Sequence, residues 1–217
     1  AASIMLSMGT APAEVATQLA RSAVPGDKEA ITALRQAAQA ISHSDAGAAA
    51  DLSKRALELM PSDDTEHGRV VAETVELLNR ARRYEQAEEL AVAALSEETS
   101  PEKEAEIRLR LTALSQHSTV RRIEENRRAL QLPNIKAVTR ARHLAWLAYN
   151  LVKLDQPGQQ RRAADDAAAA AESTGDLEAN ILAGVTLGLL EAGEGYAGRA
   201  LSRLEEVCGL ARASGVT

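Results

Sequence analysis

Residues Asn79 to Pro101 read N-R-A-R-R-Y-E-Q-A-E-E-L-A-V-A-A-L-S-E-E-T-S-P, and this stretch decides the fold. Its pattern predicts the end of one helix, a turn at Arg82 and Arg83, and a second helix with small and apolar side chains on one face. That face comprises Tyr84, Ala87, Leu90, Ala91, Ala94 and Leu95. Pro101 opens a further helix after Ser100, because proline at the first helical position loses no hydrogen bond. The stretch therefore predicts consecutive helices that pack closely through alanine.

The spacing of small residues in this stretch recurs along the chain. Tyr84 followed by Ala87 and Ala94 resembles the tetratricopeptide repeat, in which small residues lie where two helices cross. Equivalent positions are Ala56, Ala94, Ala129, Ala167 and Val207, separated by 38, 35, 38 and 40 residues. Seven residues earlier stand Ala49, Ala87, Arg122, Gln160 and Ala200, of which three are small. The recurrence predicts a stack of helix pairs rather than an ordinary bundle.

The expected architecture is an all-α, right-handed α-solenoid of about five antiparallel helix pairs. The pairs fall at approximately residues 27–60, 64–96, 101–130, 134–174 and 176–214, in one tetratricopeptide-like domain that covers residues 25–217. Each pair can bury only one face by itself, so neighbouring pairs must stack and leave a concave surface lined by their first helices. Residues 1–24 are expected to hold a short helix, the tail of an upstream domain.

The composition agrees with helices packed through small side chains and excludes several classes of protein. The chain has 217 residues, 45% of them apolar and only 2% aromatic. The net charge of −6 argues against direct binding of nucleic acid, which usually needs a basic face. The single cysteine, Cys208, rules out an internal disulfide and suits a reducing compartment. No apolar run is long enough to span a membrane, so a cytoplasmic protein is expected.

Several segments resemble the large ATP-binding LuxR-type transcriptional regulators of actinobacteria. One runs from Val15 through V-P-G-D at positions 24–27 to Ala38, and another runs from Ala48 to Pro61. Two more are Arg140–Asn150 and Ser173–Asp176. In that family a nucleotide-binding domain is followed by a helical repeat region and a C-terminal helix-turn-helix domain. The resemblance covers nearly the whole chain and implies that the chain is the repeat region.

The motifs that would bind ATP or DNA in that family are not in this sequence. There is no G-x-x-x-x-G-K-[ST] loop to cradle phosphates, and no helix-turn-helix follows Ser214. By the resemblance, ATP would bind only a missing upstream domain, and DNA only a missing C-terminal domain. The segment itself is expected to need no cofactor. It would act as a sensor and protein-interaction region that takes a small-molecule effector or a protein partner in its groove.

The strongest candidate for a binding site lies on the long first helix of the fourth pair. Its residues are Arg142, Trp146, Tyr149 and Lys153 on one face, with His143 and Asn150 on the adjacent face. Aromatic and cationic side chains on a concave wall suit a sugar, a planar metabolite or an anionic peptide. The competing interpretation is that Trp146 and Tyr149 only fill space between layers. The repeat register adds Arg69, Glu76 and Asn79 of the second pair as groove-facing candidates.

No cluster of catalytic or metal-binding residues is evident. The four histidines, His43, His67, His117 and His143, fall in different helix pairs without metal-ligand spacing. His117 is expected to bond the last carbonyls of its helix. The chain is therefore predicted not to be an enzyme. The alternative to a regulator segment is a free-standing tetratricopeptide scaffold that binds peptides or partner proteins.

Two features of the last pair bear on packing and assembly. Cys208 is expected on the inner face of the last helix, together with Ala197, Ala200, Leu201, Leu204 and Ala211. Gly184 and Gly188, four residues apart, let another backbone come close, either within the fold or in a homo-oligomer.

Overall fold

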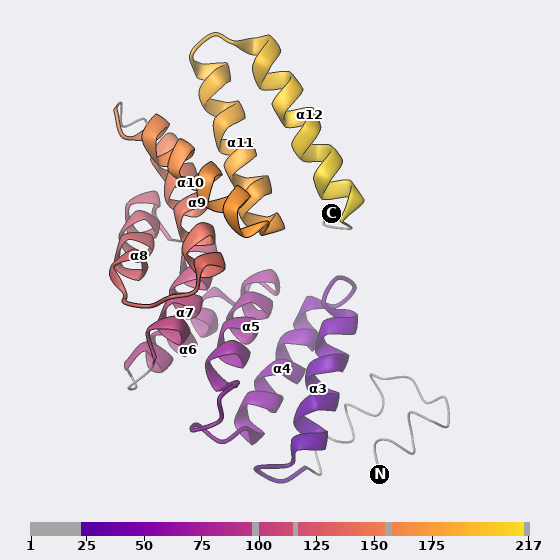
Figure 1. Ribbon diagram of the computed structural model, residues 1–217. Helices are drawn as coiled ribbons and strands as arrows, with labels where there is room; N and C mark the ends of the chain where they lie inside the picture. Colours follow the sequence, from indigo (N-terminus) through magenta and orange to yellow (C-terminus); the bar gives the residue numbers. More distant parts are fainter. Residues whose placement is uncertain (1–22, 97–99, 115–116, 155–157, 215–217) are drawn as a thin grey trace. The chain divides into compact units, whose positions relative to one another are not determined.

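The computed structural model describes residues 23–96, 100–114, 117–154 and 158–214, which fold into ten α-helices without a strand (Figure 1). The predicted all-α class is confirmed. The chain divides into two compact units, Ala1–Thr99 and Ser100–Thr217. The helix predicted within residues 1–24 lies outside the described residues, apart from positions 23 and 24. Within the described ranges, every helix is too short or too polar to cross a membrane.

The described residues of the first unit, 23–96, form four helices, and each contacts the next along the chain. They are α3 (Lys28–Ile41), α4 (Ala46–Leu59), α5 (His67–Arg80) and α6 (Tyr84–Ser96). One core cluster of this unit joins α3 to α4 through Ala30, Ile31, Leu34, Ala37, Ala56 and Leu59. The backbones of α3 and α5 do not touch each other, although α4 contacts both. This separation leaves room for a groove between two first helices.

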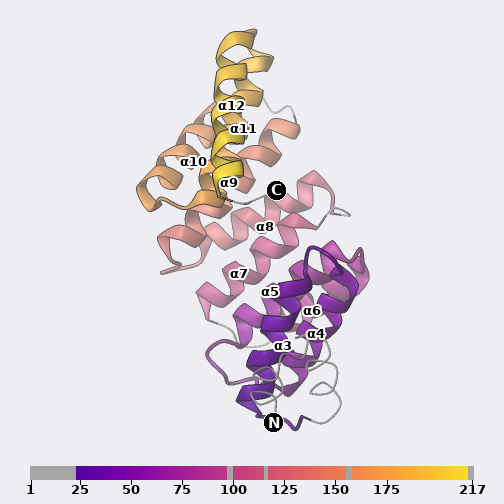
Figure 2. The same cartoon turned by 90° about the vertical axis from the view of Figure 1, so that its right-hand side faces the viewer.

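The described residues of the second unit form six helices, which are labelled in Figures 1 and 2. They are α7 (Pro101–Ala113), α8 (Thr119–Gln131), α9 (Ala137–Lys153), α10 (Gln160–Thr174), α11 (Leu177–Gly193) and α12 (Ala197–Ala213). Consecutive helices contact each other, and the first helices also meet directly, α7 with α9 and α9 with α11. The first helices of this unit are therefore packed more closely than α3 and α5.

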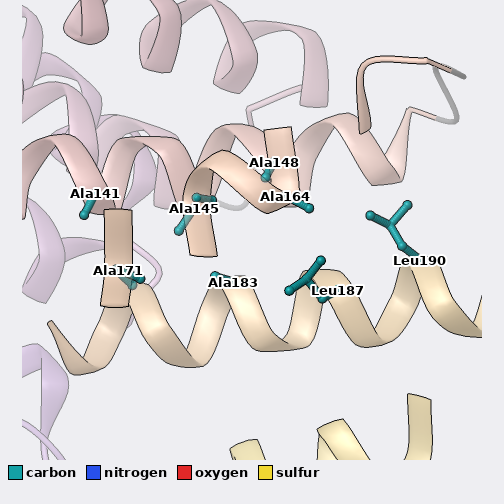
Figure 3. Close-up of a cluster of buried hydrophobic side chains, with 10 residues drawn as sticks. Ala141, Ala145, Ala148, Ala164, Ala171, Ala183, Leu187 and Leu190 are labelled. Atoms are coloured by element: carbon teal, nitrogen blue, oxygen red, sulfur yellow. The ribbon is translucent and has the colours of Figure 1, made fainter. Parts of the chain in front are cut away.

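The core around α9, α10 and α11 is built almost entirely from alanine. Figure 3 shows Ala141, Ala145 and Ala148 of α9 facing Ala183 and Leu187 of α11. The other buried members are Ala164, Ala167 and Ala171 of α10 with Ala179 and Leu190 of α11. Because the alanine side chain is a single methyl group, the axes of these three helices can lie close together. Close contact between the helix backbones then takes the place of interdigitating large side chains.

Helix ends follow the capping residues in the sequence. The side chains of Asp27, Asp45, Ser100, Ser118 and Asp176 each accept a hydrogen bond from a backbone N–H in the first turn of the helix that follows. Pro101 occupies the first turn of α7, as predicted. Gly175 closes α10 with φ of 65°, the left-handed conformation that glycine adopts without strain. The predicted turn at Arg82 and Arg83 is confirmed, and Arg82 has φ of 59°.

The small residues that define the repeat register are buried. This holds for Ala56, Ala94, Ala129, Ala167 and Val207, one on each second helix. Seven residues earlier, Ala49, Ala87 and Ala200 are buried too, whereas Arg122 and Gln160 are half-buried. The register thus marks the contact face of every second helix, although its earlier position tolerates a long side chain in α8 and α10.

Polar contacts join helices that are one repeat apart. Arg35 of α3 pairs with Glu73 of α5, and Arg142 of α9 pairs with Asp176 at the start of α11. Thr139 of α9 donates its hydroxyl hydrogen to Glu102 of α7. These partners are separated by 34 to 38 positions, which matches the repeat spacing in the sequence.

Two helices begin later than the sequence predicts. The second pair was expected to start at residue 64, but α5 begins at His67 because Asp64 turns the chain, accepting a hydrogen bond from the N–H of Glu66. Such a local side-chain bond competes with helix formation. The fourth pair was expected from residue 134, but α9 begins at Ala137 because Asn134 has φ of 55°, outside the right-handed helical region.

The predicted inner face of the last helix is partly wrong. Ala200 and Val207 of α12 are buried, but Leu201 is 59% exposed and Cys208 is exposed. The helix is turned so that Val207 and Leu204 pack over Gly184 and Gly188 of α11, where an added Cβ would meet their side chains. The two glycines therefore serve packing within this unit.

Candidate binding groove

A groove of about 500 Å³ lies between α3 and α5 in the first unit. Thr32, Arg35, Gln36, Ala38, Gln39, Ser42 and His43 line it from α3 and the turn after it. Arg69, Glu73, Glu76, Leu77 and Arg80 line it from α5, and Ser53 of α4 contributes to the floor. Nearly all of these side chains are polar, and none is a tryptophan, tyrosine or phenylalanine. The groove therefore suits a ligand that forms many hydrogen bonds.

Each wall of the groove presents a regular stripe. On α3 the stripe is Thr32, Gln36 and Gln39, continued by His43 in the turn after the helix, and on α5 it is Arg69, Glu73, Glu76 and Arg80. Both sets follow the i, i+4, i+7, i+11 spacing that brings side chains to one side of a helix. Eleven residues of helix extend about 16 Å at 1.5 Å per residue. The groove is therefore elongated, with mostly neutral hydrogen-bonding groups and Arg35 on the α3 wall and charged groups on the α5 wall.

The charged wall is held by a network of ion pairs. Arg35 reaches across from α3 and donates from Nη2 to both carboxylate oxygens of Glu73, at 2.9 and 3.0 Å. Arg69 donates from Nη1 to Glu73 at 2.8 Å and also binds Glu66. Arg80 donates to Glu76 at 2.6 Å. The hydrogen bond from Arg69 lowers the pKa of Glu66. The network fixes two arginines of the wall in defined positions.

A buried hydroxyl pair supports the floor of the groove. The hydroxyl oxygens of Ser53 on α4 and Thr74 on α5 lie 2.8 Å apart, and the Thr74 hydroxyl also lies 2.7 Å from the carbonyl oxygen of Val70. Both residues are buried. This contact ties α4 to α5 beneath the groove.

The sequence-predicted residues of the second pair are only partly brought together. Arg69 and Glu76 line the groove, whereas Asn79 is half-buried on α5 and is not among the lining residues. The sequence analysis missed the contribution of α3, including Gln36, Gln39 and Arg35. Their spacing was the signal in the sequence that could have identified them. Thr32, Gln36 and Gln39 follow an i, i+4, i+7 spacing. The same spacing recurs 37 residues later in the chain, at Arg69, Glu73 and Glu76.

On α9 the predicted aromatic and cationic residues do form one cluster. The rings of Trp146 and Tyr149 meet edge to face with centroids 6.0 Å apart. The Lys153 ammonium lies 4.6 Å from the Tyr149 ring centroid, within the range of a cation–π contact. Arg142 is tied to Asp176 at 2.7 Å and to Glu178 at 3.4 Å. This stripe has the same i, i+4, i+7, i+11 spacing as the stripe on α5.

His143 and Asn150 lie on the buried side of α9. Nε2 of His143 is 2.9 Å from the carbonyl oxygen of Ala105, and Nδ1 is 2.8 Å from Oδ1 of Asn126. Both ring nitrogens face oxygen atoms that only accept, so the neutral ring donates a hydrogen bond from one nitrogen at a time. Burial lowers the pKa of His143 to about 4. Asn150 is also buried and donates to the carbonyl oxygen of Trp146. Both side chains are therefore buried within the second unit and out of reach of a ligand at the surface of α9.

His117 makes a structural contact at the end of α7. His117 places Nδ1 3.0 Å from the carbonyl oxygen of Leu111, which confirms the predicted contact with the end of its helix. Across residues 23–96, 100–114, 117–154 and 158–214, no three histidine, cysteine or acidic side chains are arranged to hold a metal ion. Comparison of the chain with protein-family models, with curated proteins and with solved structures found no match.

Proposed function

We propose that this chain is a binding region without chemistry of its own, which takes an effector molecule or a segment of a partner protein in the groove between α3 and α5. The observation that carries the proposal is the groove itself, because two parallel stripes of polar side chains converge on one elongated space. The architecture we propose for the whole chain is a right-handed α-solenoid of about five helix pairs, in which such grooves lie between first helices.

The chemistry of the walls favours a ligand that carries both charge and neutral hydrogen-bonding groups. Gln36 and Gln39 offer both donors and acceptors, as the groups of a peptide backbone or a polyol require. Arg69 and Arg80 stand at the two ends of the charged stripe, with Glu73 and Glu76 between them. Arg69 already donates to Glu73 and Arg80 to Glu76, so a ligand meets paired charges of both signs along this wall.

The regulator context is the second part of the proposal. The resemblance of positions 15–38 and Ala48–Pro61 to LuxR-type ATP-dependent regulators supports a role as the sensor region of such a protein, in the cytoplasm. ATP and DNA would then be bound by other domains. A free-standing scaffold for peptides or partner proteins uses the same groove and differs only in what the gene encodes on either side. A phosphate-binding loop upstream and a recognition helix downstream in the gene would decide for the regulator.

Binding in the groove is tested by selection followed by substitution. The chain is offered a displayed library of random peptides and, separately, a panel of sugars, nucleotides and amino acids, with calorimetry on each hit. We expect a hit whose affinity falls at least about tenfold, or 1.4 kcal/mol, in the double variant Gln36→Ala/Gln39→Ala. Gln86→Ala on the exposed face of α6 is the matched control and should leave binding unchanged.

The aromatic stripe on α9 gives a competing location for the same ligand. Trp146→Ala/Lys153→Ala is therefore measured alongside the groove variant. If that pair abolishes binding while the glutamine pair does not, the site belongs on α9 and the groove proposal is wrong. Loss of binding with neither variant places the site elsewhere on the molecule and refutes both locations.

A further inference from the structure

One ion pair crosses the α3–α5 groove, between two helices whose backbones do not touch. Arg35 of α3 donates to the carboxylate of Glu73 on α5 from Nε at 3.2 Å and from Nη2 at 2.9 and 3.0 Å. Gln39 and Glu76 line the groove one turn further along the two helices. Both side chains of the ion pair are partly exposed, so dissolved ions and a ligand can reach it. We call this contact the Arg35–Glu73 bridge.

The second unit shows how this arrangement differs from ordinary packing. Arg142 of α9 binds Asp176 and Glu178 at the start of α11, and this contact also joins two first helices. There the two helices touch directly, and their small apolar side chains share one core. Helices α3 and α5 have no such contact of their backbones. The Arg35–Glu73 bridge therefore links two walls that stand apart on either side of a groove.

The two partners depend on the bridge to different degrees. Glu73 also accepts a hydrogen bond from Arg69 of its own helix, at 2.8 Å. Among the residues that the structure describes, Arg35 donates to Glu73 and to no other side chain. If the bridge opened, Glu73 would keep one partner and Arg35 would lose its own. Because a half-buried charged group without a partner is costly, opening is favoured by a ligand that brings a new anion to Arg35.

We propose that the Arg35–Glu73 bridge holds the groove closed at this point, and that an anionic group of the ligand opens it by replacing Glu73 on Arg35. The inference rests on the proposed binding role of the groove and adds the chemistry that the ligand must carry. A carboxylate or a phosphate forms two parallel hydrogen bonds with arginine, so either anion matches the geometry that Glu73 uses. A neutral ligand offers Arg35 no replacement and leaves the bridge in place.

The bridge is first tested without a ligand, as the distance between the two helix pairs of the first unit. Spin labels are attached at Ala40→Cys on α3 and Glu89→Cys on α6, both exposed positions, in the whole chain carrying Cys208→Ser. Arg35→Gln should lengthen and broaden the distance distribution by on the order of 3 Å, the size of a water molecule between the walls. Arg80→Gln is the matched control and should change nothing, because Arg80 pairs within its own helix.

Added anions then test the exchange on Arg35. At equal ionic strength chloride only screens the ion pair, whereas phosphate and acetate also bind the arginine fork. Phosphate or acetate should open the unchanged chain at an ionic strength at least about threefold lower than chloride does. A stronger response to phosphate favours a ligand that carries a phosphate, and a stronger response to acetate favours a carboxylate. The variant Arg35→Gln should respond to none of the three salts.

The outcomes separate the bridge from the binding role of the groove. A distance distribution that is the same in Arg35→Gln and in the unchanged chain would overturn the proposal. Equal responses to chloride, phosphate and acetate would show that the ion pair is only screened, and would refute the exchange. The proposed function fails on a different result, namely that Gln36→Ala/Gln39→Ala leaves the affinity of every library hit unchanged, whatever the spin labels report.

Discussion

His143 and Asp176 are single polar residues that each join two helix pairs. His143 lies on α9 and touches Ala105 of α7 and Asn126 of α8. Asp176 caps α11 through the N–H of Ala179 at 3.0 Å and binds Arg142 of α9. In a core made largely of alanine, such polar contacts fix the positions of neighbouring helices along each other, because small apolar side chains alone allow the helices to slide.

For His143 the burial predicts a pH dependence of stability. Its pKa is lowered to about 4 in the folded chain, mainly by burial, against an ordinary value of 6.5. The unfolded chain therefore binds more protons between these values, and stability is full above pH 6.5 and declines as pH falls toward 4. Proton linkage predicts that the free energy of unfolding falls by about 2 kcal/mol between pH 7 and pH 5. Urea unfolding at several pH values measures it.

Comparing variants separates the contribution of His143 to the pH dependence of stability from the contributions of other groups. His143→Asn lacks the ionisable ring, so the difference in unfolding free energy between it and the unchanged chain should shrink as pH falls from 7 to 5. His43→Asn, which changes an exposed histidine, should keep the full dependence of the unchanged chain. A difference between His143→Asn and the unchanged chain that stays constant with pH would mean that the buried ring does not titrate in this way.

For Asp176 two substitutions separate its charge from its role as a cap. Burial raises the pKa of the carboxyl, but the hydrogen bonds from Arg142 and the Ala179 N–H outweigh it, and the pKa lies below 3.8. Asp176→Asn keeps a side chain that can cap the helix but loses the charge, and we expect it to lower the free energy of unfolding by about 1 to 2 kcal/mol at pH 7. Asp176→Ala loses the cap as well, at about 1 kcal/mol more.

The pH profile checks that assignment. Since the folded pKa of Asp176 is depressed, its ion pair stabilises the fold above the ordinary pKa and is lost as pH falls through the folded value. The stability gap between Asp176→Asn and the unchanged chain should therefore close in acid, while the gap between Asn and Ala persists. Equal stability of the Asn and Ala variants at pH 7 would show that the cap contributes nothing.

At the scale of the helix, the sequence pattern located most elements because two signals agreed. In α6 and α7 the apolar period of 3.6 residues coincides with the turn at Arg82 or with the cap at Ser100, and the helices begin as predicted. The start of α9 was missed because a positive φ at Asn134 is a conformational choice that periodicity does not report. The face of α12 was missed in part because its apolar residues cover a broad arc, of which only the edge with Ala200 and Val207 is buried.

Close packing of α11 against α12 predicts an unusual response to glycine substitution. A Cβ at position 184 would lie 2.4 Å from Cγ2 of Val207, so Gly184→Ala should destabilise the chain by about 1 to 3 kcal/mol through overpacking. Alanine is otherwise the better helix former by about 1 kcal/mol. Gly198→Ala on α12, where an added Cβ meets nothing within 4 Å, should therefore be neutral or stabilising.

A compensating change identifies the cause. Val207→Ala removes the methyl groups that the new Cβ would meet, so Gly184→Ala/Val207→Ala should recover part of the stability lost in Gly184→Ala. Thermal unfolding of the four chains supplies the comparison. Additive losses in the double variant would mean that the two residues do not clash and that the close approach has another origin.

Across the whole molecule, the candidate site was harder to predict than the fold. The aromatic stripe on α9 stood out because Trp146 and Tyr149 are rare residue types here. The α3–α5 groove did not, since Gln36 and Gln39 on a helix look like any solvated face. A groove depends on how far apart two helices stand, and that distance follows from packing against α4 rather than from either helix. The close contact of α9 with α7 and α11 could not be read from the sequence for the same reason.

The division of the chain at residue 99 predicts that the second unit folds by itself. Its alanine core on α9, α10 and α11 draws only on residues of that unit, as do the contacts of His143 and Asp176. A fragment of residues 100–217 should be helical by circular dichroism and unfold cooperatively, with the pH dependence expected of His143. Ala145→Asp buries a charge in this core and should abolish the unfolding transition. Val138→Asp changes a residue of α9 that is 36% exposed and should preserve the transition. A fragment that lacks a cooperative transition even without substitution would show that its core is completed by residues before Ser100.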